Sequence, residues 1–205
     1  LDYGPIYQRT DKWESDWISE KGPYTQLQFG VLLTCASGIS DDREKSEALS
    51  SISTELAKQG KVEDALSCAS GISNDYLKSN ALLSISTEMF KQGKVEEAAS
   101  AIQEALVCAN GISNDYGKSQ TLSSISTELA KQGKVEEAAS AIQEALSCAS
   151  GISDDYWKSK ALSSISTELA KQGKVEEAET AIQEALACAS GISDDYWKSE
   201  AISSI

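Results

Sequence analysis

The chain has 205 residues and a mass of 21.9 kDa, enough for one or two ordinary domains with a buried core. It contains 32 acidic residues, 18 basic residues and no histidine, which gives a net charge of -14. The missing histidine excludes histidine-based catalytic triads, general bases and metal sites, and the acidic balance argues against binding of a nucleic-acid backbone. We therefore expect that the protein is not an enzyme and has no catalytic residue, and that it binds no metal, no cofactor and no nucleic acid.

The first 23 residues are rich in aromatic side chains. Trp13 and Trp17 lie four residues apart, and so on one face if the segment is helical. Residues 1–23 are interpreted either as a cap over the open end of a repeat array or as part of an assembly surface. Residues 24–37, which include Phe29, match the end of a second repeat helix and are predicted to be the last helix of a degenerate leading repeat.

A tandem repeat fills the rest of the chain. The tripeptide Gly-Ile-Ser recurs at spacings of 33, 40, 40 and 40 residues, starting at Gly38, Gly71, Gly111, Gly151 and Gly191. These positions divide the chain into a short repeat (38–70), three full repeats (71–110, 111–150 and 151–190) and the first helix of a further repeat (191–205). Residues 111–150 and 151–190 differ at only seven of forty positions, which indicates tandem duplication or consensus design.

Each repeat is predicted to be a pair of helices, as residues 151–190 illustrate. Ser153 is the expected N-cap of the first helix, followed by two acidic residues at its positive end. An apolar stripe follows, and Gly173 provides a left-handed stop. The second helix begins at Val175, whose side chain we place in the apolar set of that helix, and it ends at Gly191 as a glycine cap. The predicted fold class is all-α, a right-handed superhelical solenoid of helix-turn-helix repeats.

The short repeat differs from the others in its second helix. Seven residues are missing after Asp64, which is about two helical turns. We expect this helix to keep its apolar face and to be about 10 Å shorter than its counterparts.

The repeat resembles the tetratricopeptide repeat family. In residues 119–150 the positions that match the family pattern are Leu122, Ile125, Ser126, Leu129, Gly133, Ala138, Ile142 and Ala145. The chain departs from the family pattern in three respects: aliphatic residues replace the aromatic ones, Ser126 replaces the small glycine, and the closing proline is missing. Its period is also 40 residues rather than 34.

This resemblance implies a non-catalytic scaffold that binds a protein or peptide segment on the concave face, which the first helices line. The positions that carry over are Asn80, Leu83, Thr87, Phe90, Lys91, Gln120, Thr127, Lys131, Lys160, Thr167 and Lys171. The lysines at the edge of this surface are interpreted either as contacts for an acidic segment or as ordinary solvated helix ends.

The second repeat breaks the pattern with bulkier side chains. Leu77, Leu83, Met89, Phe90 and Val107 stand where the next repeat has smaller or different residues. Leu83 and Phe90 lie seven residues apart on one helical face, where they would form a hydrophobic hot spot for a ligand. The alternative is structural, because bulky side chains would fill a void left by the short helix of the preceding repeat.

Aromatic residues recur at the start of the first helices. Tyr76, Tyr116, Tyr156 and Tyr196 occupy one equivalent position, and Trp157 and Trp197 follow the last two. Such residues are typical of packing between repeats. Since Gly117 and Leu77 occupy the tryptophan position elsewhere, the fold does not require the tryptophans, and they are also candidates for a binding edge.

The two ends of the chain suggest an alternative function. The chain starts near a second helix and stops inside a first helix, so that two copies would join head to tail and form a filament. The residues of these assembly ends would be Trp13, Trp17, Phe29, Trp197, Ala201, Ile202 and Ile205. A monodisperse monomer in light scattering at high concentration would contradict this hypothesis.

Five cysteines occupy one equivalent position per repeat: Cys35, Cys68, Cys108, Cys148 and Cys188. Packed helices lie about 8–10 Å apart, whereas a disulfide needs Cα atoms within about 7 Å, so we interpret these residues as small core side chains. Thiols outside disulfides favour a reducing, cytoplasmic compartment. The sequence has no run of 18 apolar residues, so no membrane span is expected.

Overall fold

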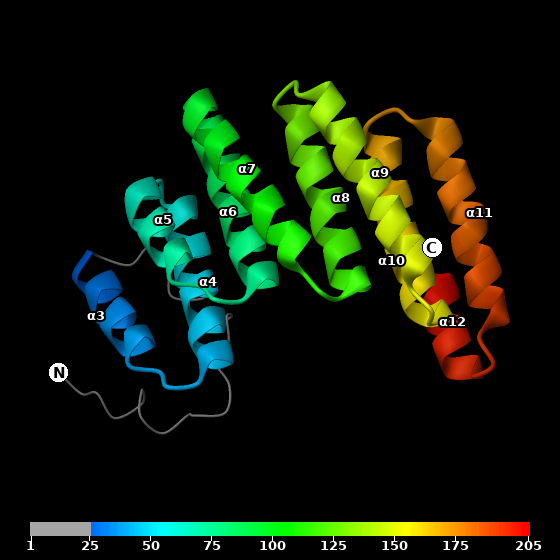
Figure 1. The fold of residues 1–205 in the computed structure, drawn as a ribbon, viewed down its shortest axis with the longest axis horizontal. Helices are drawn as coiled ribbons and strands as arrows, with labels where there is room; N and C mark the ends of the chain where they lie inside the picture. The colour runs from blue at the N-terminus through cyan, green and yellow to red at the C-terminus, as the bar shows by residue number, and fades with distance from the viewer. Residues whose placement is uncertain (1–25) are drawn as a thin grey trace. The chain divides into compact units, whose positions relative to one another are not determined.

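The computed structural model describes residues 26–205, and every regular element in that range is an α-helix (Figure 1). The ten helices are α3 (Gln26–Ser37), α4 (Asp42–Lys58), α5 (Val62–Ser70), α6 (Asp75–Lys91), α7 (Val95–Gly111), α8 (Asp115–Lys131), α9 (Val135–Gly151), α10 (Asp155–Lys171), α11 (Val175–Gly191) and α12 (Asp195–Ser203). The predicted all-α class is therefore confirmed, and α3 is the helix expected within residues 24–37. The segment 1–23, with Trp13 and Trp17, lies outside the described residues.

The chain forms two compact units, of which the first is described from residue 26 to Ala101 and the second spans Ile102–Ile205. In the first unit, α4 packs on α5 and on α6. In the second, α8 pairs with α9 and α10 pairs with α11, while α10 also contacts α8 and α12. Each unit is thus a stack of helix-turn-helix repeats, with first helices against first helices.

The first helix of each repeat starts one residue later than expected. The N-cap is Asp154, not Ser153: its carboxylate accepts a 3.1 Å hydrogen bond from the amide of Trp157. Asn114 and Asp194 do the same for the amides of Gly117 and Trp197. A side-chain oxygen at this position satisfies an unpaired amide, and where the residue is an aspartate its charge also opposes the positive end of the helix.

Glycine in the left-handed region forms the turn inside each repeat. Gly173 has a φ of 75° and Gly133 one of 77°, as predicted. In the third repeat the amide of Gly133 donates to the carbonyl of Ala130 at 3.0 Å, and that of Lys134 donates to Leu129 at 2.9 Å. This pair of bonds closes the end of a helix in the Schellman arrangement, and fixes how the second helix leaves the first.

The glycine at the end of each second helix has a different role from the predicted cap. The left-handed glycines of the described residues do not include Gly151 or Gly191, and each of these two is the last residue of its helix. A Cβ at 151 would lie 3.3 Å from Oδ2 of Asp115, and a Cβ at 191 would lie 3.0 Å from Oδ2 of Asp155. Glycine here leaves room for the close approach of a carboxylate and does not form a left-handed backbone turn.

The core of the second unit consists of aliphatic side chains at the family-like positions. Leu122, Ile125, Leu129 and Ile142 are fully buried, together with alanines on the second helices. One expectation is wrong: the valine that begins the second helix is 67% exposed at Val135 and 59% exposed at Val175. At the equivalent position of the short helix α5, by contrast, Val62 is buried.

The short second helix of the first full hairpin is confirmed. Helix α5 has nine residues, whereas α9 and α11 have seventeen each. Its apolar face is intact, because Val62, Ala65, Cys68 and Ala69 are all buried. Among the described helices, none has the combination of length and apolar character that crossing a bilayer requires.

Candidate binding site

Five aromatic side chains form a continuous row at the start of the first helices in the second unit. We call this row the aromatic edge; it consists of Tyr116 on α8, Tyr156 and Trp157 on α10, and Tyr196 and Trp197 on α12. Successive ring centroids lie 4.8, 5.1, 5.0 and 5.1 Å apart, in tilted and edge-to-face geometries. These are the arrangements that aromatic pairs favour.

The aromatic edge is partly open to solvent. Trp157 is 45% exposed, Trp197 is 46% exposed and Tyr196 is 69% exposed. The first turn of each helix places the rings there, because the N-cap carboxylate of Asp154 or Asp194 holds the amide of the tryptophan itself. The rings therefore pack between repeats and remain partly exposed, and their role as a binding edge stays a prediction.

Hydrogen bonds connect the tyrosines of the edge to residues on the predicted concave face. Gln120 donates to the phenol oxygen of Tyr116 at 2.7 Å, and Lys160 donates to that of Tyr156 at 3.2 Å. The Tyr156 hydroxyl donates in turn to Glu200 at 2.7 Å. This bond to a carboxylate, followed by burial, raises the pKa of the Tyr156 phenol. Gln120 and Lys160 thus belong to the aromatic edge more than to an open groove.

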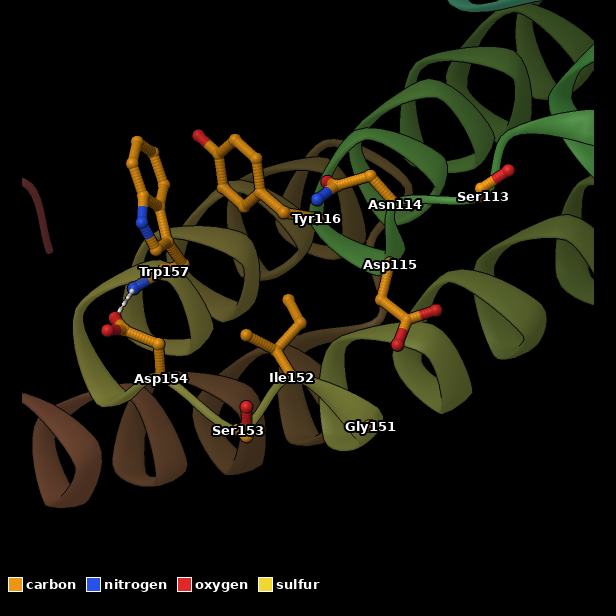
Figure 2. Close-up of a pocket in the computed structure, with 9 residues that line it drawn as sticks. All are labelled: Ser113, Asn114, Asp115, Tyr116, Gly151, Ile152, Ser153, Asp154 and Trp157. Carbon is orange, nitrogen blue, oxygen red and sulfur yellow. Dashed lines mark hydrogen bonds between the residues drawn. The ribbon is translucent and has the colours of Figure 1, made fainter.

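A pocket of about 600 Å³ lies beside the first pair of rings (Figure 2). Residues 113–116, residues 151–154 and Trp157 line it, so it is built from two successive inter-repeat turns and the starts of α8 and α10. In Figure 2 the rings of Tyr116 and Trp157 stand next to each other on one side, and Ile152 lies between the carboxylates of Asp115 and Asp154 on the other. We call this the turn pocket.

The turn pocket is acidic. Asp115 and Asp154 belong to its lining, and no lysine or arginine does so among the described residues. The lysines nearest in sequence are engaged elsewhere: Lys118 lies 3.0 Å from Glu144, and Lys158 donates to the carbonyl of Ser150 at 3.3 Å. Within residues 26–205, the pocket lining therefore has two carboxylates and no basic side chain.

The predicted lysine row is present, and each lysine has a carboxylate three residues before it. The Nζ–carboxylate distances are 2.6 Å for Lys91 with Glu88, 3.5 Å for Lys131 with Glu128 and 2.8 Å for Lys171 with Glu168. Such pairs at the solvent boundary contribute little stability, but they neutralise the row. An acidic partner segment would have to displace these carboxylates.

The threonines of the predicted face are also occupied. Thr87 donates to the carbonyl of Leu83 and Thr167 donates to that of Ser163, at 2.9 and 3.1 Å. The Thr127 hydroxyl donates to the carboxylate of Glu168 on the next first helix, with the Ser123 carbonyl 3.3 Å away as an alternative acceptor. The threonine positions thus hold the first helices to themselves and to one another.

The bulky residues of the second repeat do not share one environment. Met89 is buried, whereas Leu77, Leu83 and Phe90 are half-buried, as is Asn80 beside them. Val107 is 71% exposed, so it fills no void. Half-burial of Leu83 and Phe90 leaves both of their interpretations, hot spot and packing, as predictions.

The proposed assembly ends are only partly exposed. Phe29 is 3% exposed, with the Lys61 ammonium 4.6 Å from its ring centroid, and Ala201 is fully buried. Ile202 is 48% exposed and Ile205 is half-buried. Trp13 and Trp17 lie outside the described residues. Head-to-tail assembly stays a prediction.

The cysteines lie where a small core residue is expected. Cys68 and Cys108 are buried, and Cys35, Cys148 and Cys188 are half-buried; all five are thiols. Burial, with a smaller contribution from Asp64, raises the pKa of Cys68 to about 11, and burial also raises the pKa of Cys148 and Cys188. No cluster of acidic or cysteine side chains in residues 26–205 has the arrangement of a metal site.

Sequence reasoning identified the tryptophans of the aromatic edge but missed the turn pocket. The signal that could have revealed it is the run Gly-Ile-Ser-Asp-Asp-Tyr-Trp at residues 151–157, in which the turn, a carboxylate and two rings follow one another. Its partners, Asp115 and Tyr116, come from the preceding repeat, so the pocket exists only once the repeats have stacked.

No family model and no curated protein sequence matches the chain. Among solved structures it is similar to the crystal structure of Ton1535 from Thermococcus onnurineus NA1, with a TM-score of 0.51 and 19% identity over 92% of this chain. It is also similar to the crystal structure of BtubC (BKLC) from P. vanneervenii, with a TM-score of 0.53 and 13% identity over 88% of this chain. The aligned parts cover 55% of Ton1535 and 80% of BtubC. At these identities the likeness extends to the fold alone.

Proposed function

We propose that the chain is a non-catalytic, tetratricopeptide-like scaffold that binds an extended segment of another protein, and that the aromatic edge of the second unit is the contact surface. The observation that carries this proposal is the exposure of Trp157 and Trp197, at 45% and 46%, in a row of five rings. Partly exposed tryptophan and tyrosine are the residues most enriched among the hot spots of protein interfaces.

Structural need does not account for the tryptophans. The repeat at residues 111–150 has Gly117 at the same position and forms the same seventeen-residue first helix, with the same type of N-cap. The tryptophans pack against tyrosines of their own and the preceding repeat, yet almost half of each side chain stays open to solvent, and exposed apolar surface costs solubility. Binding of a partner is the use that offsets this cost.

In the second unit, the glutamine and the lysines of the predicted concave face are bonded to the aromatic edge or to neighbouring glutamates, so they do not form a second open contact surface. Gln120 and Lys160 orient the two tyrosine hydroxyls, and the lysine row is neutralised by glutamates. A rigid row of rings needs little ordering when a partner arrives, which favours affinity.

The test is a selection of short random peptides displayed on phage, with the full chain as bait. The comparison bait is the double variant Trp157→Leu/Trp197→Leu, and the matched control is Leu186→Ala, which removes an exposed apolar side chain from α11. We expect peptides that bind the wild type and the control and lose at least about tenfold in affinity for the double variant. Peptides that bind all three baits equally, or no enrichment on the wild type, would contradict the proposal.

A further inference from the structure

We propose that the turn pocket accepts the cationic side chain of an arginine or lysine in the partner segment. This inference rests on the proposed function, since it names the chemistry that the partner presents to one part of the same surface. Two features carry it: a pair of aromatic rings set at an angle, and two carboxylates across from them.

The rings of Tyr116 and Trp157 form two walls of a cation site. Their centroids lie 4.8 Å apart, their planes are inclined by 60°, and both side chains belong to the lining of the pocket. A cation is attracted to an aromatic face within about 6 Å of its centroid, and tryptophan and tyrosine have strong attraction of this kind. The pocket beside them has about 600 Å³, within the usual range of about 300–1,000 Å³ for a ligand pocket and enough for an arginine side chain.

The carboxylates of Asp115 and Asp154 supply the opposite charge. Asp154 uses one oxygen for the amide of Trp157, which leaves its second oxygen to accept from a guanidinium or ammonium group. Gly151 allows the approach of Asp115, since a Cβ there would lie 3.3 Å from its Oδ2. Charge-assisted hydrogen bonds to carboxylates are the strong class, and arginine suits them by its planar fork.

The wider surroundings favour a cation as well. Residues 102–205 contain sixteen acidic and eight basic residues, so the field of this unit attracts positive charge. The neighbouring Lys118 and Lys158 have other partners, Glu144 and the Ser150 carbonyl, and neither lysine belongs to the pocket lining. An uncharged apolar ligand would gain the rings but leave Asp115 and Asp154 desolvated without a partner.

The first unit provides a natural contrast. At the positions equivalent to Tyr116 and Trp157, the pair α4 and α6 has Arg43 and Leu77. Arg43 lies 3.0 Å from Glu47, and this ion pair raises its pKa. That junction therefore lacks the two aromatic walls and has a cationic side chain of its own, so the proposed cation pocket is a property of the later repeats.

The experiment follows the tryptophan indole signals of the ¹⁵N-labelled full chain by NMR, with the signal of Trp157 assigned from the Trp157→Phe variant. The probe is the blocked peptide Ac-Gly-Ser-Arg-Ser-Gly-NH₂, and its control has citrulline, an uncharged arginine analogue, in place of arginine. We expect a saturable shift of the Trp157 signal with the arginine peptide, in the millimolar range, and binding about tenfold weaker with citrulline. Equal shifts with the two peptides, or no saturable shift at Trp157, would overturn the proposal.

Two variants separate the pocket from the general negative charge. Asp115→Asn removes a carboxylate from the lining, and Glu179→Gln removes one from α11 outside it. We expect Asp115→Asn to weaken the arginine peptide about five- to tenfold and Glu179→Gln to leave its affinity within about twofold. Equal effects of both would mean attraction by net charge alone, and would also overturn the proposal.

A third variant tests the proposal even if the Asp115→Asn variant does not fold. Trp157→Gly introduces the residue that the chain itself has at position 117, and binding is then followed at the backbone amide of Gly151. Loss of the arginine-dependent shift is expected, and its persistence would overturn the proposal. The failure of this inference is distinguishable from failure of the proposed function, because peptides that need the tryptophans without containing arginine or lysine would still emerge from the phage selection.

Discussion

The hydroxyl of Ser126 donates a 2.7 Å hydrogen bond to the carbonyl oxygen of Ala138, and so joins the two helices of the third repeat. The same contact recurs in the first unit, from Ser53 to Ala65 at 2.9 Å and from Ser86 to Ala98 at 2.8 Å. In the second unit, Gln172 at the end of α10 also donates to the Ser126 hydroxyl, at 2.9 Å. The serine that departs from the tetratricopeptide pattern thus connects three helices, where glycine would only allow them to approach.

Replacement of this serine should destabilise the second unit. Ser126→Ala removes one buried hydrogen bond to Ala138 and leaves the amide of Gln172 without that acceptor, so we expect a loss of about 1–2 kcal/mol in the free energy of unfolding. Urea denaturation followed by circular dichroism measures it. Ser124→Ala, an exposed position on the same helix, is the control and should stay within about 0.5 kcal/mol of the wild type. Equal midpoints for the two variants would show that the hydroxyl contributes nothing.

Helical glycines should respond to alanine according to their neighbours. At Gly30, inside α3, a Cβ would meet no atom within 4 Å, so Gly30→Ala should stabilise the chain by about 0.5–1 kcal/mol. At Gly191 the Cβ would lie 3.0 Å from Oδ2 of Asp155, which has to move, so Gly191→Ala should gain less or lose stability.

The double variant Gly191→Ala/Asp155→Ala identifies the cause. Removal of the carboxylate should restore the benefit of alanine, so that the effect of Gly191→Ala is more favourable in the Asp155→Ala background than in the wild type. Thermal unfolding of the four proteins gives this coupling. Strict additivity would show that the carboxylate is not what requires glycine here.

Substitution of the turn glycines should lower the stability of the protein for a different reason. A Cβ at Gly133 would have no neighbour within 4 Å, but its φ is 77°, so any cost of substitution comes from the backbone alone. Gly133→Ala should lose about 1–2 kcal/mol, and Gly133→Asn should lose less because asparagine visits the left-handed region more readily. The order of the denaturation midpoints, glycine above asparagine above alanine, checks this prediction. The reverse order of the two variants would contradict it.

Stability should fall at high pH in a way that depends on Cys68. Burial raises the pKa of this thiol from 9.0 to about 11, so the folded state holds the proton more tightly than the unfolded state. The resulting stability is fully present below pH 9 and is lost as the pH rises towards 11, by about 2 kcal/mol at that point.

Cys68→Ala is the variant that isolates this effect. Between pH 8 and pH 11 its free energy of unfolding should fall less steeply than that of the wild type, because it lacks the buried thiol. Urea unfolding at a series of pH values gives both curves. Parallel curves would mean that the thiol ionises as easily in the folded protein as in the unfolded one.

The repeat pattern alone was enough to predict the helices. The positions of Gly133, Gly173 and Val175, the apolar stripe and the short α5 follow from local rules: period, turn residues and length. The predicted N-cap was wrong by one residue, because two neighbouring side chains can both cap the helix and Asp154, not Ser153, does so. These features need only a few neighbouring residues, so duplication of one hairpin reproduces them in every repeat.

What the sequence determined by itself, therefore, is the hairpin and its copying, including the charge of −14 and the absence of histidine that excluded so much at the start. Stacking decided the rest. Asp115 of the preceding repeat approaches Gly151, Gln172 donates to Ser126 of the preceding repeat, and the turn pocket takes its rings and carboxylates from two repeats. Contacts between residues about forty positions apart depend on the distance and angle between packed helices, which no local pattern contains.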